Sequence, residues 1–159
     1  MTVPFRTAVF AMGVVLSTVL PATAAATAQG SGGGAAADVV AEVNRRRAEA
    51  GCGPLRLRAD LTRAAQAHSA DMARHGRLDH IGSDGSRPHE RMRAAGYRAR
   101  HSGEAIASAS GDAGTVTELW MESPGHRDLI LTCRYRDAGV GRADRADGPW
   151  WTLDLATGP

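Results

Sequence analysis

Three side chains in this sequence have the chemistry and the setting of a reactive or metal-binding site: His80, Glu104 and His126. His80 lies in LDHIG, before a glycine-rich loop, where we expect the chain to leave a helix and turn inward. Glu104 lies beside Ala105 and Ile106, so its carboxylate risks burial and must then be paired or ligated. The three residues are 24 and 22 positions apart, so no local spacing forces them together.

The stretch WMESPGHRDLIL (120–131) gives His126 two interpretations. Ser123 is a favoured N-cap residue, and Pro124 fits the first position of a helix. The N–H groups and the dipole at a helix start disfavour an imidazolium, and a neutral imidazole is the form that binds metals or acts as a base. His126 is therefore either a bystander in the first turn or a site residue that the cap holds in place.

The other histidines have structural interpretations. His68 and His75 are seven residues apart on one predicted helix, about 10 Å along its axis, which is too far for one metal ion. We expect His68 to be a core or boundary histidine bonded to a neighbour, and His89 and His101 to be solvated. No H-E-x-x-H, Walker or G-x-S-x-G motif occurs, so local motifs indicate no enzyme.

Helices are the elements that must position these residues. Apolar residues at helical spacing predict helices over 37–51, 60–76 and 87–97, and another that begins after Asp112 and leads into 120–131. Asp60 and Asp112 are the expected N-caps of the second and fourth of these helices. The segment 102–112 is too rich in glycine and serine for an assignment.

The end of the chain changes from a helical to a strand period. RDAGVGRA and PWWTLDLA, separated by DRADG, predict an antiparallel hairpin. Trp151, Leu153 and Leu155 alternate with Thr152 and Asp154, which predicts that one face of the sheet is buried. Helices followed by strands favour an α+β fold, with helices packed against the sheet.

Residues 1–28 have the three-part pattern of a secretory signal peptide. Arg6 is followed by an apolar run over 7–20 and by small residues with A-x-A cleavage options after Ala24 or Ala28. Fourteen apolar residues are too few to span a bilayer, so we expect no transmembrane anchor in the mature chain. Residues 29–37 are expected to form a flexible tether, and 38–157 one secreted domain.

The charge of the chain limits the partners that we expect, and its cysteines indicate its compartment. All nineteen basic residues are arginine, and they are scattered along a chain of formal net charge +2, which predicts no nucleic-acid partner. The only two cysteines are Cys52 and Cys133. In an exported chain they indicate a disulfide, whereas in the cytosol they would be free thiols.

Four motifs in this order resemble the CAP domain of cysteine-rich secretory proteins, antigen five and plant pathogenesis-related proteins. They are LTRAAQAHSADMARHGRLDH, GEAIA, WMESPGHRDLIL and AGVGRA with GPWWTLDLA. The resemblance covers about residues 37–156 and is nearest to the bacterial SCP-like branch. It implies a three-layer α/β/α sandwich, with a central and mostly antiparallel sheet and an open cleft on one side.

In this family the cleft carries two histidines and two glutamates. The resemblance assigns His80 and His126 as the histidines and Glu104 as the first glutamate. In several relatives the two histidines bind a divalent cation, commonly zinc. This sequence departs from the pattern in two places, since Ser123 occupies the register of the second glutamate and Ala105 replaces the usual asparagine.

Two functions follow as expectations from the resemblance. The first is a secreted, monomeric binding module whose cleft holds a divalent cation such as Zn²⁺, a lipid or sterol, or a cell-envelope ligand. The alternative is a metal-assisted hydrolase of envelope peptides or glycans, with His80 and His126 as metal ligands and Glu104 as the catalytic carboxylate. The incomplete set of cleft residues favours binding, and a purely structural hydrogen-bonded network is a third hypothesis.

Overall fold

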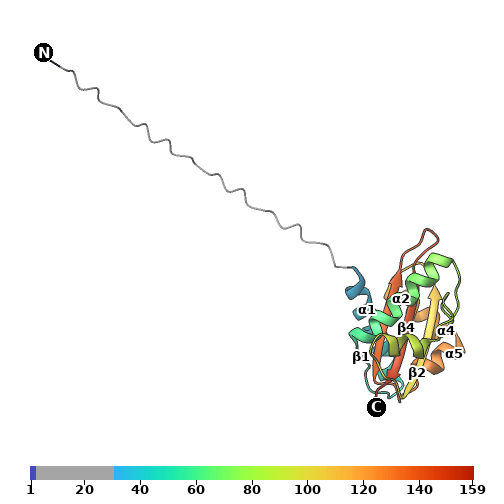
Figure 1. The fold of residues 1–159 in the computed structure, drawn as a ribbon. Coiled ribbons are helices and arrows are strands. Elements are labelled where there is room, and N and C mark those ends of the chain that lie inside the picture. Colours follow the sequence, from blue (N-terminus) through green and yellow to red (C-terminus); the bar gives the residue numbers. More distant parts are fainter. Residues whose placement is uncertain (3–30) are drawn as a thin grey trace.

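A four-stranded sheet forms the middle layer of the computed structural model, which describes residues 1–2 and 31–159 (Figure 1). Its strands are β1 (Arg56–Leu57), β2 (His101–Ser108), β3 (Asp137–Ala143) and β4 (Trp150–Thr157), in the order β1-β3-β4-β2. β4 pairs antiparallel with both β2 and β3, and β1 pairs parallel with β3. The predicted hairpin is therefore present, and the signal-peptide prediction falls almost entirely outside the described residues.

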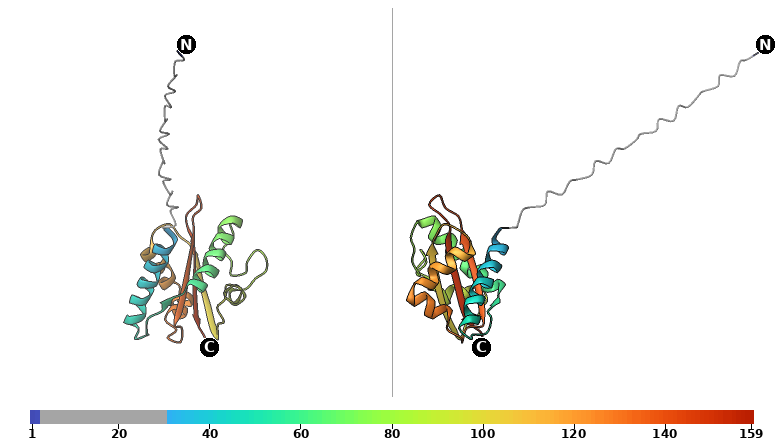
Figure 2. Two further views of the ribbon diagram at one scale, coloured as in Figure 1. Left: turned by 60° about the vertical axis from the view of Figure 1, so that its left-hand side comes forward. Right: turned by 180° about the vertical axis from the view of Figure 1, so that it is seen from behind.

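Helices cover both faces of this sheet (Figure 2). The helices α1 (Ser31–Glu49), α4 (Ala113–Glu122) and α5 (Pro124–Ile130) share one core with the sheet. The helices α2 (Ala59–His75) and α3 (Pro88–Ala94) pack on the opposite face, as the left view of Figure 2 shows for α2 in green and α1 in blue. The expected α/β/α sandwich is confirmed.

Both faces of β4 are buried, although its sequence pattern predicted only one buried face. Trp151, Leu153 and Leu155 lie in the core with α1 and α4. Thr152 and Asp154 are only 0% and 1% exposed, because α2 packs directly on their face of the sheet. The prediction was wrong here because alternation reports polarity, whereas burial depends on which helix covers the face.

Two of the predicted helix starts differ from the structure. α2 begins at Ala59, and Asp60 lies in its first turn, where its carboxylate accepts from the N–H of Leu61. α1 begins at Ser31, so residues 31–37 are helical rather than a flexible tether. Burial of Ala36 in the core with the rest of α1 explains this earlier start.

The other local predictions have mixed outcomes. Asp112 caps α4 as expected, since its carboxylate accepts from the N–H of Thr115. Ser123 occupies the N-cap position of α5 and Pro124 its first turn, but the Ser123 side chain makes no capping hydrogen bond. The unassigned segment 102–112 contains most of β2, because pairing with β4 outweighs a weak local strand preference.

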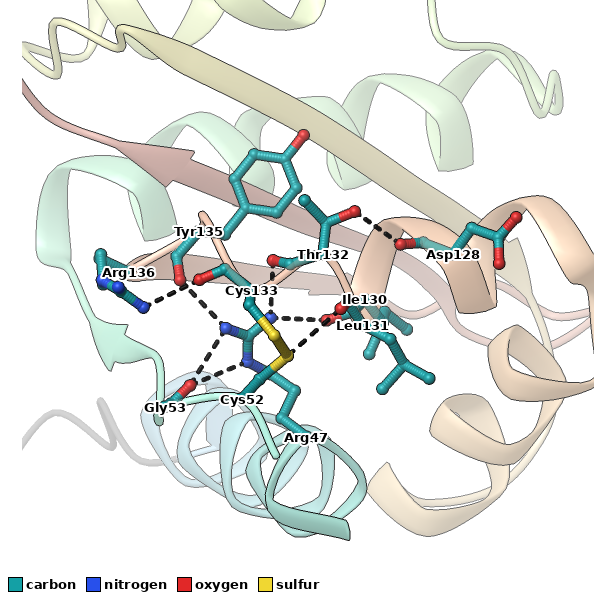
Figure 3. Close-up of a disulfide and its surroundings, with 10 residues drawn as sticks. All are labelled: Arg47, Cys52, Gly53, Asp128, Ile130, Leu131, Thr132, Cys133, Tyr135 and Arg136. Atoms are coloured by element: carbon teal, nitrogen blue, oxygen red, sulfur yellow. Dashed lines mark hydrogen bonds between the residues drawn. A yellow bond between two sulfur atoms is a disulfide. The ribbon is translucent and has the colours of Figure 1, made fainter. Parts of the chain in front are cut away.

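Cys52 and Cys133 form the disulfide that the sequence indicated, and it lies beside a buried arginine (Figure 3). The two Cα atoms are 4.9 Å apart across a sequence separation of 81. Next to them Arg47 is 0% exposed, and no carboxylate of the described residues pairs with it. Its guanidinium instead donates to the carbonyls of four residues: Gly53, Ile130, Thr132 and Tyr135. The disulfide and Arg47 together join the end of α1 to the segment after α5.

Removing the disulfide is expected to lower the free energy of unfolding by about 2–4 kcal/mol, because the unfolded chain gains the entropy of a long open loop. The variant Cys52→Ala/Cys133→Ala measures this in urea, and chemical reduction of the wild type should give a similar loss. Free thiols in protein prepared under oxidising conditions would contradict the bond.

Two glycines of β3 allow α2 to approach the sheet. A Cβ atom at Gly141 would lie 2.3 Å from backbone atoms of Ala65, and one at Gly139 would lie 2.1 Å from the backbone carbon of Leu61. Both contacts are with helix backbone, which cannot rotate out of the way. The close packing of α2 on β3 therefore requires these glycines.

Gly141→Ala is expected to destabilise the protein by about 1–3 kcal/mol, because the added methyl forces α2 away from the sheet. Gly34→Ala is the matched control. Gly34 lies in α1 with nothing within 4 Å of the added atom, and alanine there should stabilise the helix by up to about 1 kcal/mol. Urea unfolding measures both, and equal effects would show that close packing at Gly141 is not the cause.

Candidate functional site

Glu104 is the buried charge at the centre of the candidate site. It lies on β2, on the face of the sheet that α2 and α3 cover, and its side chain is only 2% exposed. Its Oε1 lies 2.7 Å from Nδ1 of His80, and its Oε2 accepts a hydrogen bond of 2.6 Å from Arg91. Two cationic or cation-forming partners thus compensate the cost of burying the carboxylate.

His80 is oriented by this carboxylate. The hydrogen bond to Glu104 raises the pKa of His80 above its ordinary value, against the opposing effect of burial. Since the carboxylate can only accept, Nδ1 of His80 carries the proton. The ring is 49% exposed, and Nε2 is the nitrogen left for a ligand.

His68, on α2, also lies beside Glu104. Its Nε2 lies 2.9 Å from the carbonyl of Asp79 and 3.8 Å from Oε1 of Glu104. Burial lowers the pKa of His68, so the ring is neutral, with its proton on Nε2 facing the carbonyl. The prediction of a core histidine bonded to a neighbour is confirmed, whereas its position beside Glu104 was not predicted.

Asp154, like Arg91, is a residue of the site that was not predicted from the sequence. It is the direct partner of Glu104 in the pairing of β2 with β4, and it is 1% exposed. Burial, and then the negative charge of Glu104, raise the pKa of Asp154 well above its ordinary value. A protonated Asp154 can donate to Glu104, which lets two carboxyl groups share this interior. The only sequence signal was its place in the strand alternation, which suggested a solvent-facing position.

His126 belongs to the other helical layer. It lies in the first turn of α5. Leu129 of the same helix packs against Gly103. Gly103 precedes Glu104 in β2, so the two residues face opposite sides of the sheet. Burial, and then the charge of His80, lower the pKa of His126. His126 is therefore a neutral imidazole within electrostatic reach of His80. Ser123 is half-buried, and the described residues give its side chain no hydrogen bond to this site.

The loop after His80 is held to α2 by Asp71. Its carboxylate accepts from both the N–H and the hydroxyl of Ser83, at 2.8 and 2.7 Å. At the end of the loop, Arg91 donates to the carbonyl of Ser86 with one nitrogen and to Glu104 with another. These bonds fix the segment that carries His80 relative to the sheet.

The donor atoms limit the metal that this site could hold. In residues 1–2 and 31–159, no three His, Cys, Asp or Glu side chains are grouped as a metal site. Both oxygens of Glu104 are occupied by His80 and Arg91, so Glu104 is not free to be a ligand. Two imidazoles remain, one of them aimed by a carboxylate in the arrangement common to histidine ligands. The described residues therefore offer two imidazoles, those of His80 and His126, as candidate ligands and do not form a three-ligand centre.

Sequence comparison assigns the chain to a family. Residues 40–155 match CAP, the cysteine-rich secretory protein family. The chain belongs to the CAP family. The match spans α2, β2, α5 and the β3–β4 hairpin, the elements that carry or support the site residues.

Individual relatives agree with this assignment. The chain is 32% identical to YkwD of Bacillus subtilis over 114 residues, which is 72% of this chain but only 44% of YkwD. An extracellular SCP-domain protein of Bacillus anthracis has a similar fold, with a TM-score of 0.73 at 22% identity over 79% of this chain and 41% of that protein. An outer surface protein of Borrelia burgdorferi gives a TM-score of 0.69 at 16% identity, over 76% of this chain and 90% of that protein. No helix of the described residues is long and apolar enough to cross a membrane.

The Asp71 tether predicts a pH-dependent stability. Burial would raise the pKa of Asp71, but the hydrogen bonds from Ser83 and Arg74 outweigh it and hold the value at about 2, below the ordinary 3.8. A lowered carboxyl pKa stabilises the fold above the ordinary value and loses that stability as the pH falls toward 2. Asp71→Asn should therefore cost about 1–2 kcal/mol at neutral pH, and its difference from wild type should shrink between pH 4 and 2.

The matched control is Asp128→Asn, which neutralises an exposed carboxylate with no hydrogen bond from its side chain among the described residues. It should change the unfolding free energy by less than about 0.5 kcal/mol. Urea titrations across this pH range measure both variants. A constant difference for Asp71→Asn at every pH would contradict the role of its charge.

Proposed function

We propose that this protein is an exported CAP-domain binding module whose cleft binds a divalent cation between His80 and His126. The observation that carries the proposal is the 2.7 Å contact between Glu104 and Nδ1 of His80. It fixes the ring and leaves Nε2 as the donor, while burial and then the charge of His80 lower the pKa of His126 and favour its neutral form. Neutral imidazole is the form that binds metal, and Zn²⁺ accepts such nitrogen ligands.

Export is supported by the signal-peptide pattern of residues 1–28 and by the description of the Bacillus anthracis neighbour as extracellular. The disulfide has the same implication, because such bonds persist in oxidising compartments. These observations are consistent with a module that works outside the cell.

The two hydrogen bonds that the Glu104 carboxylate accepts favour a binding function over hydrolysis. A general base needs a free oxygen directed at the water it activates. In this structure one Glu104 oxygen faces His80 and the other faces Arg91, and Asp154, whose pKa is raised by burial and then by the charge of Glu104, lies across the strand pair. Glu104 therefore acts as a positioning residue for His80 rather than as a catalytic base.

Zinc titration of the mature protein by calorimetry tests the proposal. Wild type should bind one Zn²⁺, and His80→Ala and His126→Ala should each weaken binding at least about tenfold by removing one of two protein ligands. His89→Ala is the matched control, since His89 is exposed and outside the site. Equal affinities for all three variants and wild type would overturn the two-histidine site.

Glu104→Gln tests the orienting role separately. The amide keeps the shape of the side chain but weakens the acceptor for His80, so zinc affinity should fall about tenfold, as for other residues that support a ligand. Turnover of envelope peptides or glycans by the zinc-loaded wild type, abolished by Glu104→Gln, would instead establish the hydrolase that we disfavour.

A further inference from the structure

Arginines that are scattered along the sequence meet at one end of the fold. Three short segments, RLR (56–58), RAR (98–100) and RYR (134–136), each contribute two exposed arginines. All three lie at the end of the sheet where β4 finishes: Arg56 pairs with Asp137 at the start of β3, and the backbone N–H of Arg136 donates to the carbonyl of Ala156. Thr157 connects RAR with RYR. Its carbonyl accepts from the backbone N–H of Arg100, and its hydroxyl donates to the carbonyl of Arg134. Figure 1 shows β1 and the start of β2 beside the C-terminus.

We call these six arginines the arginine end. Carboxylates neutralise only part of their positive charge. Arg56 and Arg58 are paired with Asp137 and Asp60. The other four form no ion pair with any carboxylate of the described residues: Arg98, Arg100, Arg134 and Arg136. The fold thus concentrates positive charge at one end of a chain whose net charge is only +2.

A cavity of about 560 Å³ opens among these side chains. Four of the six arginines line it (Arg56, Arg58, Arg98 and Arg136), with Asp60, Asp137 and Tyr97 between them. Guanidinium groups present planar sets of donors that match the oxygens of phosphate groups. We infer that the arginine end binds a polymer that carries phosphate groups, with Arg98 and Arg136 at the cavity as its central contacts.

Two other polyanionic partners fit less well. Single-stranded nucleic acid is held by stacking its bases on exposed aromatic rings, but Tyr97 is only 5% exposed and its hydroxyl is bonded to Asp137. An anionic membrane surface would be met by several exposed apolar side chains, and Leu57 is the one large apolar residue exposed among the three arginine segments. A phosphate polymer without bases needs neither feature.

The test uses inorganic polyphosphate as the probe, with the mature protein, at about 50 and about 200 mM NaCl. Arg98→Gln/Arg136→Gln should weaken binding about tenfold at the lower salt. It should also reduce the slope of log affinity against log salt by about 1.4, since each lost phosphate contact contributes about 0.7. Arg93→Gln/Arg127→Gln removes the same charge from exposed arginines elsewhere and should change affinity less than about twofold.

Three results would overturn the inference. Equal losses in the two double variants would show attraction to net charge alone. Orthophosphate binding as tightly as the polymer would mean a single-phosphate site. Single-stranded DNA binding more tightly than polyphosphate would assign the arginine end to nucleic acid. Because all four substituted side chains are exposed, matching unfolding midpoints will confirm that both double variants fold.

Discussion

The carboxylate of Glu104 is buried between the sheet and the α2–α3 layer, and the arrangement of the residues around it follows from the cost of that burial. An unpaired charge at this depth would be strongly destabilising, so separate segments supply its partners. The loop after α2 supplies His80, α3 supplies Arg91, and β4 places Asp154 opposite Glu104, with a pKa that burial and the charge of Glu104 raise well above its ordinary value. Each partner is fixed in turn because it must reach the same pair of oxygens.

Arg47 is a buried cation in the other helical layer, on α1. Its guanidinium donates hydrogen bonds to backbone carbonyls near the two cysteines, among them those of Gly53, Ile130 and Tyr135 (Figure 3). These carbonyls, rather than a carboxylate, compensate the buried cation. These carbonyls belong partly to the end of α5, where the helix dipole is negative. Arg47 therefore anchors the C-terminal end of the helix whose first turn presents His126. Of the two buried charges, Glu104 thus contacts His80 directly, whereas Arg47 supports only the far end of the helix that carries His126.

The hydrogen bonds of Glu104 also bear on function. A carboxylate whose oxygens are both engaged can orient a histidine, but it has no free oxygen for water activation. Ser123 stands where the resemblance places a second glutamate, so this chain has no carboxylate at that position. Both proposals, a metal ion at His80 and His126 and a phosphate polymer at the arginine end, concern recognition rather than catalysis.

Local rules were enough to predict much of the framework from sequence. The valine face of α1, the cap of α4 by Asp112 and the β3–β4 hairpin depend on neighbours within a few residues, and His80, Glu104 and His126 followed from motif resemblance. The tertiary structure alone decided that Asp154 faces Glu104, that Arg91 completes its pairing, and that scattered arginines meet at one end. The reason is physical: a side chain's environment depends on which distant segment packs over it, and sequence spacing does not contain that information.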